Sequence, residues 1–221
     1  MIRWWKGILK DIQDKTGQMD KDQKLEYIFT YYWYHILIAA IGLGIFVLLI
    51  YHIFFGEKPK EFTCVMVNQA IDYERDERLL EDFAADSGIL AERISIDSNY
   101  VFSYVGKQLE GANESSYDKF FFGMGAGELN AAVIPESFYR YCMELEYEFV
   151  NIGDMLTKEQ KELWQGELLG NDGVYSGIYV EKMYLREYIQ QDDDDPAILV
   201  FLQSRRDSGK NRAFLAFSMG Q

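Results

Sequence analysis

The longest apolar run of the sequence lies near its N-terminus. From Ile36 to Ile50 no residue carries a polar side chain, and the stretch from Tyr31 to Phe55 is interrupted only by two histidines. A helix needs about 20 such residues to cross a hydrocarbon core of roughly 30 Å. Aromatic rings, which prefer the headgroup level of a bilayer, stand at both ends: Tyr31, Tyr32, Trp33, Tyr34, Tyr51, Phe54 and Phe55. The pattern predicts a transmembrane helix over 31–55. No small-x-small cleavage pattern precedes Gly56, so we expect a retained anchor rather than a signal peptide.

The segment before this helix, 1–30, has an amphipathic pattern. Its apolar positions, spaced for one helical stripe, are Ile2, Trp4, Trp5, Ile8, Leu9 and Ile12. Such a helix can lie in the membrane interface, with its basic residues near anionic lipids, or pack against a partner protein. Residues 16–18 should break it, and Asp20 or Asp22 can cap a second helix that runs on through the membrane.

Beyond the anchor, residues 56–221 alternate between two periodicities. Runs with strand character cover 62–68, 92–97, 131–134, 175–180 and 197–202, and helical patterns cover 74–86, 117–124, 135–145, 158–164 and 209–219. Gly88 is placed to end one helix, and Thr157 and Gln160 have the spacing of a capping box. Strands that alternate with helices predict one α/β domain with a mostly parallel sheet and helices on both faces.

Charge limits the partners of this domain. The chain carries 22 basic and 36 acidic residues, a formal charge of −14, and residues 1–30 contribute six of the basic and five of the acidic ones. An acidic domain is repelled by phosphate backbones, so nucleic acid is not an expected partner. The excess of Lys and Arg before the membrane favours a cytoplasmic N-terminus and an extracellular domain at the cell membrane.

The composition of the domain also argues against catalysis. The only histidines, His35 and His52, lie in the membrane segment, which removes the usual triads and the commonest metal ligand. We therefore expect no enzyme activity, no cofactor and no metal site. Residues 123–127, rich in glycine, follow a helix and precede a strand, which is the reverse of a phosphate loop. Asp192 to Asp195 are expected to form a solvated loop rather than a Ca²⁺ site, because like charges repel one another. Cys64 and Cys142 lie in apolar runs, where they can be core residues or form one disulfide.

One long stretch carries a family resemblance. The sequence from Tyr117 to Leu156, with its turn Gly127-Glu-Leu-Asn130 before a short apolar strand, resembles extracellular solute-binding proteins of the type II periplasmic-binding fold. Residues 173–182 and 196–219 are similar to the returning strand and closing helix of that family. Asn130 stands where the family usually has Asp, and the domain is shorter than a two-lobed binding protein. The anchor sequence from Lys24 to Ala39 resembles that of uncharacterised single-pass membrane proteins of low-GC Gram-positive bacteria, whose domain is extracytoplasmic.

These observations lead to one leading hypothesis and two alternatives. We expect a membrane-anchored extracytoplasmic module that captures a small solute or serves as an accessory partner of a transporter or other membrane complex. Most aromatic residues should be core, with Tyr100 and Tyr104 the exceptions at the surface; these two and Asn130 are the candidate ligand-binding residues. The alternatives are a transmembrane sensor of an extracellular ligand and a hydrolase that works through carboxylates. The ligand, the partner and the oligomeric state are not encoded in any motif.

Overall fold

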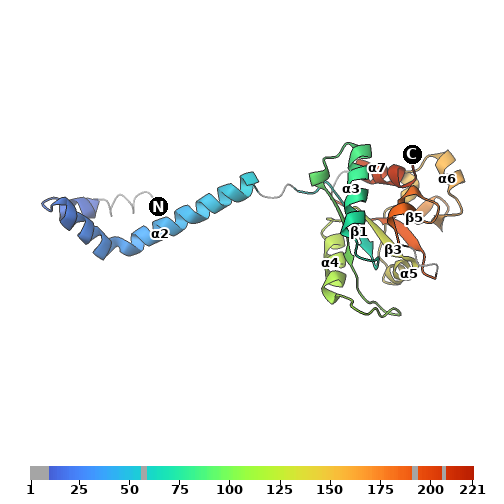
Figure 1. The fold of residues 1–221 in the computed structure, drawn as a ribbon, viewed down its shortest axis with the longest axis horizontal. Coiled ribbons are helices and arrows are strands. Elements are labelled where there is room, and N and C mark those ends of the chain that lie inside the picture. The colour runs from blue at the N-terminus through green and yellow to red at the C-terminus, as the bar shows by residue number, and fades with distance from the viewer. Residues whose placement is uncertain (1–9, 56–58, 191–193, 206–207) are drawn as a thin grey trace. The chain divides into compact units, whose positions relative to one another are not determined.

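The computed structural model describes residues 10–55, 59–190, 194–205 and 208–221. The chain divides into two compact units, Met1–Glu57 and Lys58–Gln221 (Figure 1). Each unit is described below by itself.

In the N-terminal unit a short helix precedes the long helix and folds back against its first turns. Residues 10–16 are helical, and α2 (Lys21–Phe55) follows after a short turn. Asp20 caps α2, because its carboxylate accepts the backbone N–H groups of Asp22 at 3.1 Å and Gln23 at 2.9 Å. The Tyr32 hydroxyl donates to the carboxylate of Asp11 at 2.5 Å, so the first helix folds back along the beginning of α2. The predicted break and cap are confirmed; residues 2–9 of the predicted amphipathic stripe lie outside the described residues.

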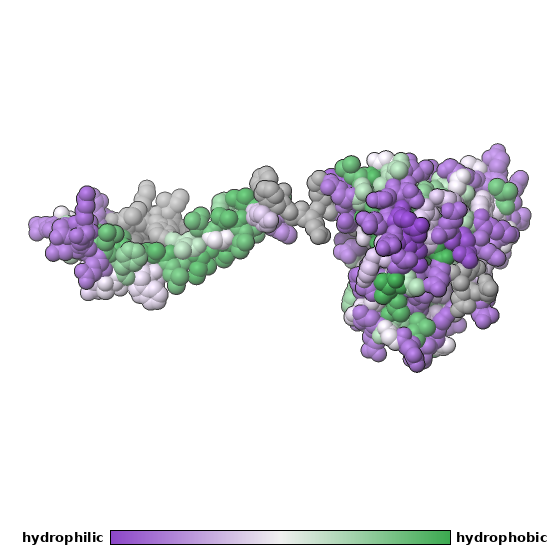
Figure 2. All heavy atoms as spheres, in the orientation of Figure 1, coloured by the Kyte–Doolittle hydropathy of each residue, from purple (hydrophilic) through white to green (hydrophobic). Residues whose placement is uncertain are grey.

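Helix α2 is long and apolar enough to cross a membrane. Its 35 residues extend for roughly 52 Å at 1.5 Å per residue. The large hydrophobic side chains from Ile36 to Ile53 are 41% to 74% exposed, and Figure 2 shows them gathered along the helix. From Ile36 to Ile53 the helix is apolar on all sides and its large side chains are exposed, which suits this part of α2 to lipid rather than to water.

The second unit is built on one sheet of six strands in the order β2-β1-β3-β6-β5-β4. The strands are β1 (Phe62–Val67), β2 (Ile94–Tyr100), β3 (Ala131–Pro135), β4 (Leu168–Asn171), β5 (Val174–Tyr179) and β6 (Ala197–Phe201). β2, β1 and β3 are parallel, whereas β6, β5 and β4 continue the sheet in antiparallel pairs. The sheet is therefore mixed, with its parallel half formed by the first three strands.

Helices cover both faces of this sheet. One face packs under α3 (Tyr73–Ser87) and α7 (Ser208–Ser218), where the rings of Phe83 and Phe214 meet at 5.0 Å. The other face packs under α4 (Glu114–Gly125) and α5 (Glu136–Glu144), where Phe120 and Phe138 meet at 5.4 Å. The remaining elements are α6 (Lys158–Leu163) and the 3-10 helices η1 (Ala91–Arg93), η2 (Ile152–Asp154) and η3 (Tyr184–Tyr188). The predicted α/β class, with helices on both faces, is confirmed.

Local signals fix several helix ends. Gly88 has a φ of 70° and ends α3, as predicted, because its left-handed conformation is easiest for glycine. Thr157 and Gln160 form the predicted capping box of α6, with reciprocal bonds of 3.2 Å and 2.8 Å. These helix ends could be predicted from the sequence because each depends on residues that are close together in the chain.

The two cysteines lie on opposite sides of the sheet. Both are free and fully buried, Cys64 on β1 in the core beneath α3 and Cys142 on the inner face of α5 in the other core. A disulfide needs Cβ atoms about 4 Å apart, which the intervening sheet prevents. The core interpretation of both residues is therefore confirmed.

Candidate functional site

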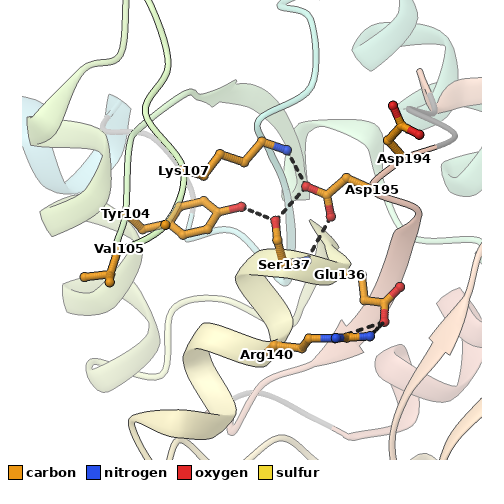
Figure 3. A pocket seen from close by; sticks show the side chains of 9 residues that line it. Tyr104, Val105, Lys107, Glu136, Ser137, Arg140, Asp194 and Asp195 are labelled. Carbon is orange, nitrogen blue, oxygen red and sulfur yellow. Dashed lines mark hydrogen bonds and ion pairs between the residues drawn. The ribbon is translucent and has the colours of Figure 1, made fainter.

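The candidate site lies where the parallel strands end. Ligands of open α/β sheets bind outside the carboxyl ends of the strands, and here the connections that follow β2 and β3 meet the residues that precede the antiparallel β6. Together they form a surface pocket of 420 Å³, which we call the latch pocket. Its lining residues are Tyr104, Val105, Gly106, Lys107, Glu136, Ser137, Arg140, Asp194 and Asp195 (Figure 3).

The connection between β2 and α4 forms one wall and is locally ordered. Tyr104 and Lys107 pair as a small antiparallel bridge, with N–H···O bonds of 3.1 Å and 3.0 Å, and Gly106 turns the chain with a φ of 88°. At the base of the connection, the Asn68 side chain accepts the N–H of Phe102 at 3.0 Å. These contacts fix the position of the Tyr104 side chain relative to the end of β1.

Asp195 is the centre of the latch pocket. Its carboxylate accepts the backbone N–H of Ser137 at 2.8 Å and the Ser137 hydroxyl at 2.6 Å, and it forms an ion pair with Lys107. The Tyr104 hydroxyl contacts the Ser137 hydroxyl at 2.6 Å (Figure 3). Asp195 thus occupies the N-terminal end of α5, where a negative charge is stabilised. Although burial opposes the charged form, the bonds from Lys107 and Ser137 outweigh it and lower the pKa of Asp195.

A second ion pair lines the latch pocket from α5. Arg140 forms an ion pair with Glu136 one turn earlier on α5, and its side chain is 72% exposed. Both cations that line the latch pocket are therefore already paired with carboxylates of the same pocket. A ligand that enters must compete with these internal pairs.

A second cavity lies against the same loop. It has a volume of 320 Å³ and is lined by Ser103, Tyr104, Val105, Glu114, Tyr117, Asp118 and Tyr141. We call it the tyrosine pocket. Tyr104 and Val105 line both cavities, so the loop residues that follow β2 are shared between them. In Figure 3 the Val105 side chain points away from the Asp195 cluster.

In the structure the three predicted site residues lie in three different surroundings. Tyr104 lines both pockets, and its role in ligand binding stays a prediction. Tyr100 contacts Lys119, whose Nζ lies 4.5 Å from the ring centre. Asn130 is fully buried and joins β1 to α7, because it accepts the Thr63 N–H and donates to Asn211, both at 3.1 Å.

The expected surface position of Tyr100 and Tyr104 is wrong. They are 3% and 5% exposed, whereas Phe122, expected in the core, is 76% exposed. In β2 the register shifts between Asp97 and Tyr100, which turns Tyr100 toward the opposite core from Ile94 and Ile96. Periodicity alone does not reveal such a bulge.

Sequence reasoning missed Lys107, Ser137 and Asp195. The acidic run was expected to form a solvated loop, and Asp194 is indeed exposed, but the Asp195 side chain is only 10% exposed. Asp192 and Asp193 lie outside the described residues. Asp195 directly precedes Pro196 and a strand that pairs with β3, and this pairing carries it to the N-terminus of α5. No local signal marks that long-range contact.

The polar groups that line the latch pocket are suited to hydrogen bonds and ion pairs with a ligand. Ser137 has a hydroxyl close to a carboxylate, but a carboxylate with a lowered pKa is a weak general base. Within the described ranges, no group of three or more His, Cys, Asp or Glu side chains is arranged to hold a metal ion. Comparisons of the chain with protein-family models, with curated proteins and with solved structures find no match.

Proposed function

We propose that this protein is a membrane-anchored extracytoplasmic binding module without enzymatic activity. The observation that carries the proposal is the pair of pockets at the carboxyl ends of the parallel strands, on a compact unit that follows a helix able to cross a membrane. Convergent polar groups in a concave surface are typical of sites for small ligands. The resemblance to extracellular solute-binding proteins supports the same function.

The size of the unit supports an accessory role beside a transporter or another membrane complex. Residues 58–221 form one compact unit around one sheet, whereas a two-lobed binding protein closes two such units around its ligand. We therefore place this module as a component that captures a small solute and presents it to a membrane partner. The orientation with the N-terminus in the cytoplasm belongs to this proposal.

The proposal is tested by thermal unfolding of the full chain in detergent. The panel contains sugars, amino acids, alkylammonium compounds, short peptides and Ca²⁺. A ligand at 100 times its dissociation constant adds about 2.7 kcal/mol to the free energy of unfolding. We expect a clear rise in Tm with one ligand class. A flat profile across the whole panel, with a cooperative transition, would contradict solute capture.

A further inference from the structure

The tyrosine pocket differs from the latch pocket in its charge. Glu114 and Asp118 lie one turn apart on α4 and both line the cavity. In the part of the chain that the structure describes, neither carboxylate forms an ion pair. The adjacent cation in sequence, Lys119, is paired with Asp97 at 3.1 Å instead. The pocket therefore presents two carboxylates that form no ion pair with any cation of the described residues.

The rest of the lining is aromatic. Tyr117 and Tyr141 are half-buried, and their hydroxyl groups are hydrogen-bonded to one another at 2.9 Å. Tyr141 stacks on Tyr104 with ring centres 5.7 Å apart, which holds its ring in place. Burial raises the pKa of Tyr117, so its phenol stays neutral at physiological pH. Neutral tyrosine rings attract cations through the negative faces of their π systems.

The N-terminal end of α4 opposes this attraction only in part. A helix N-terminus acts as roughly half a positive charge, and Asn113 already accepts the N–H of Ser115 there at 3.1 Å. Two full carboxylate charges outweigh this partial one. The net field in the pocket favours a cation.

We infer that the tyrosine pocket binds the ammonium group of a small alkylammonium compound. This inference rests on the proposed function and names its ligand class. Carboxylates and tyrosine rings together recognise an organic cation, whereas an anion would be repelled by Glu114 and Asp118. The volume of 320 Å³ fits a ligand with a few heavy atoms around nitrogen.

The first test is direct binding of choline to the full chain. The protein is held in a maltoside detergent, which contains no ammonium group, and binding is measured by calorimetry. We expect choline to bind, and dimethylbutanol, its uncharged carbon isostere, to bind at least about tenfold more weakly because it lacks the charge. Phosphocholine should also bind more weakly than choline, because its phosphate faces Glu114 and Asp118; this arm separates a free cation from a lipid headgroup. Equal binding of choline and its isostere would overturn the inference.

The second test removes the charges and the ring separately. Glu114→Gln with Asp118→Asn should weaken choline binding at least about tenfold. The matched control, Glu159→Gln with Glu162→Gln on the exposed face of α6, removes the same charge elsewhere and should leave binding unchanged. Tyr117→Phe keeps the ring and should retain binding, whereas Tyr117→Leu should lose it. If Tyr117→Leu does not fold, the Glu114→Gln and Asp118→Asn variant still tests whether choline binds in the tyrosine pocket.

The outcomes separate this inference from the proposed function. If choline fails to bind while another ligand of the panel raises Tm, the inference is wrong and solute capture stands. If neither choline nor any panel ligand binds, both are overturned. Choline binding that is unchanged in the carboxylate variant also overturns the assignment of this pocket.

Discussion

At the residue scale, Asp195 shows how one side chain serves two elements. It caps α5 from a distant part of the chain and holds the loop after β2 through Lys107. The backbone N–H groups at a helix start need acceptors, and α5 begins after Pro135, which provides no side-chain cap. The cap therefore comes from the segment before β6.

Asp195→Asn should lower the free energy of unfolding by about 1–2 kcal/mol at neutral pH, because Lys107 loses its charge partner. The folded state lowers the pKa of Asp195 from its ordinary value of 3.8. Its contribution is therefore complete above that value and is lost as pH falls through the lower pKa of the folded state. Urea unfolding across this range should show the difference between wild type and variant shrinking in acid. The exposed neighbour variant, Asp194→Asn, should show a smaller effect; a pH-independent difference for Asp195→Asn would contradict the role of charge.

At the scale of elements, β4 is the strand that sequence reasoning did not find, whereas β5 was predicted over 175–180. Asp172 and Gly173, with φ values of 55° and 85°, join Asn171 to its partner Val174 in a two-residue turn. Both positive φ values are typical of the type I′ turn that an Asp-Gly pair favours. The Asp172-Gly173 dipeptide could therefore have predicted the turn. The strand before it is harder to predict, because β4 has only four residues and no clear alternation.

This hairpin packs against η2 through a close backbone contact. The Asn151 side chain accepts the N–H groups of Gly153 at 2.9 Å and Tyr175 at 2.8 Å. A Cβ atom at Gly153 would overlap the carbonyl oxygen of Gly173. Only glycine fits between η2 and the turn of the hairpin.

Gly153→Ala should therefore lower the free energy of unfolding by about 1–3 kcal/mol, because backbone must move to accept the methyl group. Chemical denaturation of the full chain measures this. Gly166→Ala is the matched control, since a Cβ there would meet nothing within 4 Å; it should change stability by no more than about 0.5 kcal/mol. Equal stability of the two variants would show that the contact at Gly153 relaxes freely.

At the scale of the whole molecule, the buried cysteines make the orientation measurable. Cys64 and Cys142 are fully buried, and burial raises the pKa of Cys142 to about 12. Thiol reagents attack the thiolate, so the native cysteines should not react in the folded protein. A new surface cysteine would then report its own compartment.

Glu159→Cys places a thiol on the exposed surface of α6, and Asp14→Cys places one before α2. With the N-terminus in the cytoplasm, a membrane-impermeant maleimide should label Glu159→Cys in intact cells. Asp14→Cys should be labelled only after the membrane is opened. The wild-type chain is the control for the native thiols, and the reverse labelling pattern would place the large unit inside the cell.

The sequence by itself determined the features whose causes are local. The apolar run through Ile36–Ile50 requires a helix suited to lipid, Gly88 and the Thr157–Gln160 pair end and begin helices, and the alternating patterns define the α/β class. Only the tertiary structure decided the antiparallel insertion of β6 between β3 and β5, the inward turn of Tyr100, and the meeting of Lys107, Ser137 and Asp195. Periodicity reports which face of an element is buried, but strand order and side-chain convergence depend on contacts between residues far apart in the chain. The candidate site is formed by such contacts, and for this reason the sequence alone indicated only Tyr104 among its residues.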